Sequence, residues 1–298
     1  MPELPEVEVV RAGLEPAVTG ATIAAVTVFD ERSLRRHDGP SEDFVDRLAG
    51  RTVLSAERRG KFLWLPLAPT PLLEPDEAPE ALVVHLGMSG QVLLRDRVTD
   101  DRLTRIRLDI DHPQHGALRL NFVDQRIFGS MAIDTMLQTA DVPGERVPGQ
   151  VAHIARDPLD PAFDDRRFLA RLAARSTGVK RALLDQTLIS GVGNIYADEA
   201  LWAARIHYAQ PTATLSRARA KLLLAEVRLV LAKALGEGGT SFDAQYVNVN
   251  GASGYFSHSL NAYGQQGTPC ARCGRPIIRE SFMNRGSHFC PFCQRVRG

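Results

Sequence analysis

Pro2 and Glu3, in the opening stretch PELPEVE, are the residues whose types and position could most directly do chemistry. Met1 is readily removed when a small residue follows it, and its removal would leave Pro2 with a free secondary amine. An α-amino group titrates at about 7.7–8.0, so a fraction of it is neutral and nucleophilic at physiological pH. Attack on a carbonyl-like carbon would give a cationic iminium, an electron sink for elimination, and the adjacent Glu3 could act as a general acid. The alternative is that Pro2 only stiffens the terminus.

A second group with chemical potential is a set of four cysteines close to the C-terminus. They form two CxxC pairs that are separated by 16 residues, namely Cys270, Cys273, Cys290 and Cys293. This spacing matches one tetrahedral structural zinc ion. Disulfides require an oxidising compartment, and the acidic N-terminus does not resemble a signal peptide, so we expect Zn²⁺ rather than disulfides.

The segment around these cysteines is strongly basic, with six arginines against one glutamate between residues 270 and 298. A basic zinc hairpin most often binds a nucleic-acid backbone. The alternative is a zinc-stabilised hairpin whose basic surface is incidental, because the cysteine spacing does not specify a ligand.

A helix over residues 5–15 is expected to position Pro2. Its apolar side chains recur at i, i+3 and i+7, at Val7, Val10 and Leu14. Pro16 is expected to kink or end this helix. Glu8, on the same helix, is interpreted as a solvated residue.

From residue 20 to about residue 135 the pattern becomes alternating. The stretches LTRIRLDI and ALRLNF flank the turn DHPQHG, and RTVLSAE and KFLWLPL flank the turn RRG. This pattern predicts antiparallel strands in a sandwich or flattened barrel. A Pro/Gly-rich stretch near residues 139–152 without periodicity is interpreted as a linker.

Beyond the linker the period is helical. Helices are expected over residues 160–175, 178–189, 190–206 and 216–239, with Ser216 as the N-cap and Gly236 as the C-cap of the last one. The chain from about residue 238 is predicted to be a Gly/Ser/Asn-rich loop followed by the cysteine segment. We find no internal repeats and no coiled-coil pattern.

The net charge of +1 hides an asymmetry between the two halves of the chain. Residues 151–298 hold 19 basic and 11 acidic side chains, whereas residues 1–150 hold 17 and 24. A basic C-terminal half suggests a polyanionic partner, although a solvated charged surface would look the same. No apolar stretch approaches the roughly 20 residues of a membrane helix, so we expect a soluble, cytoplasmic protein.

Several longer motifs occur in one order along the whole chain. They are PELPEVE, RRGK, HLGMSG, DQRIFG, DQTLISGVGNIYADEAL, GGTSF, GYF and FMNRGSHFCPFC. In these motifs the sequence resembles bacterial formamidopyrimidine-DNA glycosylase, of the formamidopyrimidine-DNA glycosylase/endonuclease VIII family. Leu4 resembles this enzyme more than endonuclease VIII, its pyrimidine-preferring relative, which usually has glycine there.

The resemblance implies an α+β multidomain fold. An N-terminal helix and antiparallel β-sandwich would occupy residues 1–138, a linker 139–152, a helix–two-turns–helix domain 153–250, and a lesion loop and zinc-finger hairpin 251–298. It also implies a monomeric base-excision repair enzyme that acts on oxidised or abasic double-stranded DNA. The alternatives are a catalytically silent damaged-DNA-binding protein on the same scaffold and a glycosylase that prefers oxidised pyrimidines.

The resemblance also implies the catalytic residues. Pro2 would be the Schiff-base nucleophile, and Glu3 would protonate the sugar ring oxygen. Lys61 would donate a proton in elimination and contact a phosphate. Arg285 would bind the phosphates that flank the lesion and act as the donor in δ-elimination, and Glu6 would support the site.

The remaining implied residues contact DNA. Damaged bases must leave the stack, and the gap must be filled. The family does this with residues that correspond to Met88, Arg126 and Phe128, because a thioether and an aromatic ring can enter a base stack while an arginine pairs with the orphaned base.

Three further DNA contacts are implied. Asn194 is expected at a helix N-terminus as a phosphate contact; the alternative is an N-cap, and both roles can hold together. Lys180 would lie near the damaged strand, and Tyr255 near the end of the loop that closes over the flipped base. A histidine that many members carry near Arg105 is missing, and the insert at residues 66–81 is longer than the resemblance implies.

Overall fold

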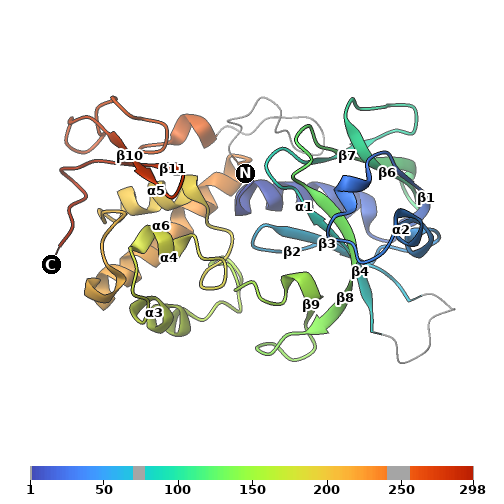
Figure 1. Cartoon of the computed structure of the whole chain (residues 1–298), viewed down its shortest axis with the longest axis horizontal. Helices are drawn as coiled ribbons and strands as arrows, with labels where there is room; N and C mark the ends of the chain where they lie inside the picture. Colours follow the sequence, from blue (N-terminus) through green and yellow to red (C-terminus); the bar gives the residue numbers. More distant parts are fainter. Residues whose placement is uncertain (1, 70–77, 240–255, 298) are drawn as a thin grey trace. The chain divides into compact units, whose positions relative to one another are not determined.

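The computed structural model describes residues 2–69, 78–239 and 256–297 (Figure 1). The chain divides into two compact units. Within the described residues, the first unit comprises residues 2 and 6–153, and the second comprises residues 3–5, 154–239 and 256–297. The three boundaries between the segments expected from the sequence stay a prediction.

The first unit contains two antiparallel sheets. One has the strand order β1-β6-β7-β5, formed by Thr22–Val28, Thr104–His112, Gly116–Val123 and Gln91–Arg95. The other has the order β2-β3-β4-β8-β9, formed by Glu57–Arg59, Phe62–Pro66, Glu80–His85, Ser130–Gln138 and Arg146–Pro148. The predicted combination of a helix and antiparallel sheets is confirmed.

The core of the first unit forms because apolar side chains of the helix and of both sheets meet in one cluster. The predicted helix face, Val7, Val10 and Leu14, is buried in this cluster. Leu82 of β4 and Phe122 of β7 lie in the same cluster. Burial of a large apolar side chain contributes about 1.5–3 kcal/mol, so this packing holds the helix on the sheets.

The local structure of the first unit differs from the sequence pattern in three places. Helix α1 runs from Leu4 to Val18 and includes Pro16, because a proline in the last turn removes only one of the final hydrogen bonds. The linker contains strand β9, which pairs with β8, and the short helix η2 at Gly149–Val151. A short helix η1 at Glu31–Leu34 and helix α2 at Ser41–Leu48 were not predicted.

The second unit is helical and ends in a hairpin. Its elements are α3 (Asp165–Ala173), α4 (Val179–Leu183), α5 (Asn194–Ala203), η3 (Thr212–Thr214), α6 (Arg217–Gly236), η4 (Phe256–Ser259), β10 (Ile278–Phe282) and β11 (Arg285–Phe289). Leu4 contributes to its apolar core, together with Tyr196 of α5 and Leu223 of α6.

The helix ends in this unit follow local capping chemistry. Ser216 caps α6 by accepting a hydrogen bond from the Arg219 amide, as predicted. The C-cap is Glu237 rather than Gly236. Helix α3 begins only at Asp165, because the Asp164 side chain caps it. Helix α4 ends at Leu183, six residues earlier than expected.

Among the described residues, no helix is long and apolar enough to cross a membrane.

Candidate active site and nucleic-acid interface

The structure divides the candidate residues between the two units. The first unit holds Pro2, Glu6, Lys61, Met88, Arg126 and Phe128. The second holds Glu3, Lys180, Asn194, Arg285 and the four cysteines. Tyr255 lies outside the described residues, as do the middle of the 66–81 insert and most of the expected lesion loop.

The Glu3 carboxylate binds the N-terminus of helix α5. Its Oε2 atom accepts hydrogen bonds from the amides of Gly193 at 2.7 Å and Tyr196 at 3.4 Å. Its Oε1 atom accepts one from Ile195 at 3.0 Å. The first amides of a helix have no partner within the helix and carry a partial positive charge, so they suit a carboxylate. Glu3 is 3% exposed, and this binding fixes the residue that directly follows Pro2.

Glycines in the stretch SGVGNIY make room for the N-terminal segment. A Cβ atom on Gly193 would lie 2.2 Å from the Glu3 carboxyl carbon. Gly191 has a φ of +83°, and a Cβ there would lie 2.6 Å from Leu4 Cδ1. The Leu4 amide also donates a hydrogen bond to the Gly191 carbonyl at 2.9 Å. This loop is therefore shaped around residues 3 and 4.

Asn194 is the first residue of helix α5 and not its N-cap, which is Gly193. The alternative role of Asn194 as the N-cap does not hold, because Glu3 binds the amides that a cap would serve. The Asn194 side chain instead donates a hydrogen bond from Nδ2 to the Gly286 carbonyl at 3.1 Å. It therefore connects α5 to the hairpin strand that carries Arg285.

Lys180 also binds this hairpin. It is fully buried, and its Nζ atom lies 2.6 Å from Asp198 Oδ1 and 3.4 Å from the Gly286 carbonyl. The same ammonium lies over the Phe282 ring, 5.0 Å from its centroid. Burial lowers the pKa of Lys180, and the ion pair with Asp198 partly offsets this.

Asp198 was not identified from the sequence, yet it links three elements. Besides Lys180, its carboxylate accepts hydrogen bonds from the Ser287 hydroxyl at 3.1 Å and the His288 amide at 2.8 Å. It is 1% exposed. Helices α4 and α5 therefore hold strand β11 through one buried carboxylate. The only sequence signal for this role was an acidic residue one helical turn after Asn194.

The β10–β11 hairpin presents Arg285 at its turn. Met283 and Asn284 have φ values of 45° and 61°, as a two-residue type I′ turn requires, and Phe282 pairs with Arg285. Arg285 is exposed, whereas the four residues after it are buried. The turn therefore holds Arg285 on a short, firmly anchored support.

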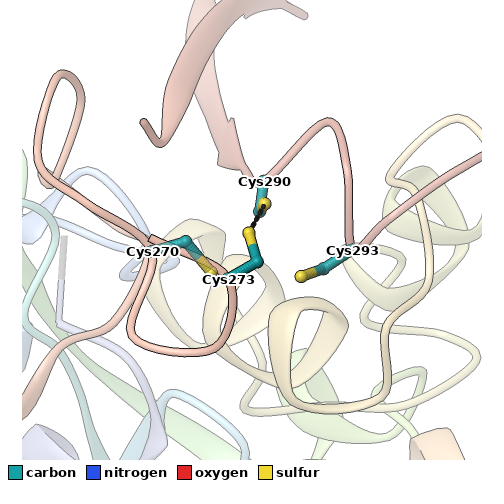
Figure 2. Close-up of side chains that lie close together, drawn as sticks. All are labelled: Cys270, Cys273, Cys290 and Cys293. Carbon is teal, nitrogen blue, oxygen red and sulfur yellow. Dashed lines mark hydrogen bonds between the residues drawn. The ribbon is translucent and has the colours of Figure 1, made fainter. Parts of the chain in front are cut away.

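The four cysteines form a site for one metal ion. Their sulfur atoms all lie within 4.8 Å of one another, and the Sγ atoms of Cys273 and Cys290 are 3.5 Å apart (Figure 2). This separation excludes a disulfide between those two and is close to the roughly 3.8 Å expected for tetrahedral zinc with bonds of about 2.3 Å. The prediction of one structural zinc is confirmed by this cluster together with the family match given below.

The electrostatics of the cluster also fit a bound cation. Burial and the neighbouring sulfur atoms raise the pKa of Cys293 to about 12. Four adjacent thiolates would repel one another, so a divalent cation is the natural counter-charge. The Ile277 side chain packs beside the site, and Arg272 lies over the Trp202 ring, 3.8 Å from its centroid.

In the first unit, Lys61 lies in the tight turn between strands β2 and β3, where Gly60 has a φ of 59°. Arg58 in β2 donates to the Gly60 carbonyl at 3.1 Å and to Glu8 Oε2 at 2.8 Å. The interpretation of Glu8 as a solvated residue was therefore wrong. Its carboxylate joins helix α1 to the hairpin that carries Lys61.

Two arginines lower the pKa of Glu8, although burial alone would raise it. Arg11 donates to Glu8 from Nε and Nη2, at 3.0 Å and 2.8 Å, and Arg58 completes the cluster. Glu6 is 3% exposed in the first turn of α1. Glu6 and Glu8 therefore lie in contact with the fold rather than pointing freely into solvent.

The residues expected to enter the base stack lie on two loops that touch. Met88 is in the turn after β4, and Arg126 and Phe128 follow β7. A Cβ on Gly87 would lie 2.3 Å from the Phe128 carbonyl carbon, so the loops approach within backbone contact. Met88 and Phe128 are 42% and 50% exposed. Large apolar side chains that remain exposed on adjacent loops suit insertion into another molecule.

Asp124 connects these loops from inside. Its Oδ1 atom accepts from the Ser89 hydroxyl at 2.6 Å and the Arg126 amide at 3.1 Å. Its Oδ2 atom accepts from the Gly129 amide at 2.7 Å. The Arg105 side chain donates to the Asp124 carbonyl at 2.8 Å.

Comparisons with known proteins agree with this arrangement along the whole chain. The formamidopyrimidine-DNA glycosylase N-terminal domain matches residues 1–131, and the H2TH domain of the same enzyme matches residues 154–245. A zinc finger found in this enzyme and in isoleucyl-tRNA synthetase matches residues 267–296.

Curated relatives carry the same name over their full length. Formamidopyrimidine-DNA glycosylase from Leifsonia xyli is 64% identical and covers 99% of this chain and 100% of the relative. The enzyme of that name from Thermobifida fusca is 53% identical and covers 99% and 97%.

Solved structures show the same fold. A variant of the Lactococcus lactis enzyme in complex with DNA that contains Fapy-dG superposes with a TM-score of 0.81 at 29% identity, covering 99% of this chain and 100% of that one. The Thermus thermophilus protein superposes with a TM-score of 0.80 at 34% identity, with complete coverage of both chains. This protein therefore belongs to the formamidopyrimidine-DNA glycosylase family.

Proposed function

We propose that this protein is a bifunctional DNA glycosylase and abasic-site lyase of base-excision repair. Its substrates would be formamidopyrimidines and 8-oxoguanine in double-stranded DNA. Support comes from full-length relatives of that name and from related structures that hold DNA with Fapy-dG or an abasic site. The structural observation that carries the proposal is the Glu3 carboxylate, fixed by three backbone amides directly beside Pro2.

The proposed glycosylase steps use the Pro2 amine as the nucleophile and the adjacent Glu3 as the acid. The neutral Pro2 amine attacks C1′ of the damaged nucleotide, and the N-glycosidic bond breaks as the new C–N bond forms. The base leaves with the bonding electrons and takes up a proton. The proline nitrogen loses its proton and its lone pair expels O4′, which opens the sugar to an iminium. Glu3 supplies the proton that O4′ receives.

Elimination then cleaves the backbone on both sides of the sugar. Loss of a proton from C2′ converts the iminium to an enamine, which expels the 3′ phosphate and becomes an unsaturated iminium. Loss of a proton from C4′ then supplies the electrons that break the C5′–O bond and expel the 5′ phosphate, and hydrolysis of the remaining iminium restores the Pro2 amine. We propose Lys61 as the proton donor in elimination and Arg285 as the donor in the second, δ-elimination. Each of these side chains lies at a tight turn. A zinc ion bound by the four cysteines would fix the hairpin that carries Arg285.

The proposed DNA contacts fall into two groups. Met88, Arg126 and Phe128 would fill the space that the flipped base leaves. Asn194 and Lys180 would act on the DNA through the hairpin, because both bind the Gly286 carbonyl beside Arg285. Tyr255 stays a prediction from the sequence. We also propose a monomer that works on the nucleoid in the cytoplasm.

Borohydride trapping tests the nucleophile. Wild-type protein incubated with 8-oxoguanine DNA and borohydride should form a covalent complex, and both Pro2→Gly and a form that retains Met1 should lose it. Lys233→Ala, on the exposed face of α6, is the control and should trap normally. Trapping by Pro2→Gly at the wild-type level would refute the assignment. If the wild-type protein bound damaged DNA but excised nothing, a catalytically silent damaged-DNA-binding protein would be favoured. Excision rates on DNA with different oxidised purines and pyrimidines would reveal a pyrimidine preference.

A further inference from the structure

The loop that carries Arg126 and Phe128 is also held from its outer side, by Arg35. This arginine follows the short helix η1 and lies 92 residues from its first partner. Its Nη1 atom donates to the Ile127 carbonyl at 2.7 Å and to the Gly129 carbonyl at 3.0 Å. Its Nη2 atom donates to the Phe128 carbonyl. One guanidinium therefore binds three consecutive carbonyls.

This loop needs such support because its backbone conformation is unfavourable by itself. Ile127 has a φ of 56°, and a β-branched residue rarely adopts positive φ. Such a conformation is energetically unfavourable and persists only where surrounding contacts impose it. Within the loop, Asp124 binds two amides, while Arg35 binds the carbonyls.

We propose that Arg35 is a positioning residue, which together with Asp124 fixes the tip Arg126–Phe128 in the shape that enters DNA. This inference rests on the proposed function. It adds a residue that controls how the tip enters the DNA and how the protein recognises the base opposite the lesion. A loop that is ordered before DNA arrives does not lose conformational freedom on binding, so insertion is easier. Without Arg35 the tip would have to be ordered by the DNA itself.

The test compares Arg35→Ala with Arg32→Ala. Arg32 is an exposed arginine of the same short helix and pairs with Asp30 instead of the loop. Arg35 is itself exposed, so its removal should leave the fold intact. Single-turnover excision of 8-oxoguanine from duplex DNA should slow about tenfold in Arg35→Ala, the effect of losing roughly one net hydrogen bond to a charged group. The ratio of rates for different opposite bases should also change.

Two readouts separate positioning from other roles. An abasic site in single-stranded DNA has no base-stack gap to fill and no opposite base. β-Elimination at such a site should therefore proceed at the wild-type rate in Arg35→Ala. The salt dependence of duplex binding should also keep its slope. If Arg35 were a phosphate contact, the slope would fall by about one and the proposal would be overturned.

Further outcomes are equally decisive. Equal slowing on duplex and single strand, or slowing by Arg32→Ala to the same degree, would overturn the proposal. Arg35→Lys, which keeps the charge and can reach fewer carbonyls, should recover part of the duplex rate. A wild-type protein that excises nothing would instead refute the proposed function, whereas normal duplex excision by Arg35→Ala would refute this inference alone.

Discussion

Gly193→Ala should inactivate the enzyme without unfolding it. A Cβ at this position would lie 2.2 Å from Glu3 Cδ and 2.4 Å from its Oε1. The backbone of Gly193, with φ of −126°, is one that alanine adopts without strain. The Glu3 side chain must therefore move away from the helix that holds it.

The size of the effect follows from this displacement. Restoring an ordinary carbon–carbon contact of about 3.5 Å requires a shift of roughly 1 Å. Such a shift stretches the bonds from the Gly193 and Ile195 amides, which are now 2.7 Å and 3.0 Å long. Misplacement of a catalytic group by about 1 Å can cost about 100-fold in rate. We expect that loss in single-turnover excision, with the free energy of unfolding lowered by only about 1–2 kcal/mol, as for a lost helix cap.

A matched control is Gly178→Ala. Gly178 is the N-cap of helix α4, and the nearest atoms to a Cβ there are 3.4 Å away. The Gly178→Ala variant should excise 8-oxoguanine at the wild-type rate. In a Glu3→Ala background, Gly193→Ala should cost no further stability, because the side chain it displaces is absent. Wild-type excision by Gly193→Ala alone would show that the position of Glu3 does not limit the reaction.

Further predictions concern the zinc site, a buried ion pair and a buried histidine. Metal analysis should find one zinc per chain, and Cys293→Ala should lower both zinc content and DNA affinity. Lys180→Met should lower the free energy of unfolding by about 3–5 kcal/mol, because the buried Asp198 carboxylate loses its ammonium partner, whereas the double variant Lys180→Met/Asp198→Leu should recover much of that loss in urea unfolding. Burial, Arg36, Arg35 and Lys61 lower the pKa of His85 to about 4. The unfolded chain then binds more protons than the fold between about pH 6.5 and 4, so stability is complete above this window and falls with pH through it. From pH 7 to pH 5 the loss should reach up to about 2 kcal/mol and be absent in His85→Asn.

The sequence predicted the parts of the site whose geometry is local. Two CxxC pairs contain most of the information about their metal site, because each pair forms one half of the ligand set within a single turn. The adjacency of Pro2 and Glu3 is likewise independent of the fold. The alternating strands and the buried face of helix α1 follow from periodicity alone.

Residues whose partners lie far along the chain could not be interpreted in this way. Glu8 looks like any charged residue on a helix until strand β2 brings Arg58 to it. Lys180 looks like a DNA-binding residue, but Asp198 holds it in the core of the second unit. The alternative of Asn194 as an N-cap fails because the amides of that helix are bound by Glu3, which lies about 190 positions earlier. In each case a long-range pairing determined the role of a polar side chain.

The binding of Glu3 also has a consequence for the order of events during synthesis. Glu3 is among the first residues made, but the amide of Gly193 that fixes it lies 190 residues later. While the ribosome is still extending the first unit, removal of Met1 can already expose the N-terminal amine. The backbone amides that bind the Glu3 carboxylate have not yet been made at that stage. If Pro2 is the nucleophile, as proposed, the nascent chain would carry its reactive amine without a fixed acid until most of the protein has been made. A truncated product that lacks α5 would have Pro2 and Lys61 but no fixed acid, so incomplete chains would be poor at cutting DNA.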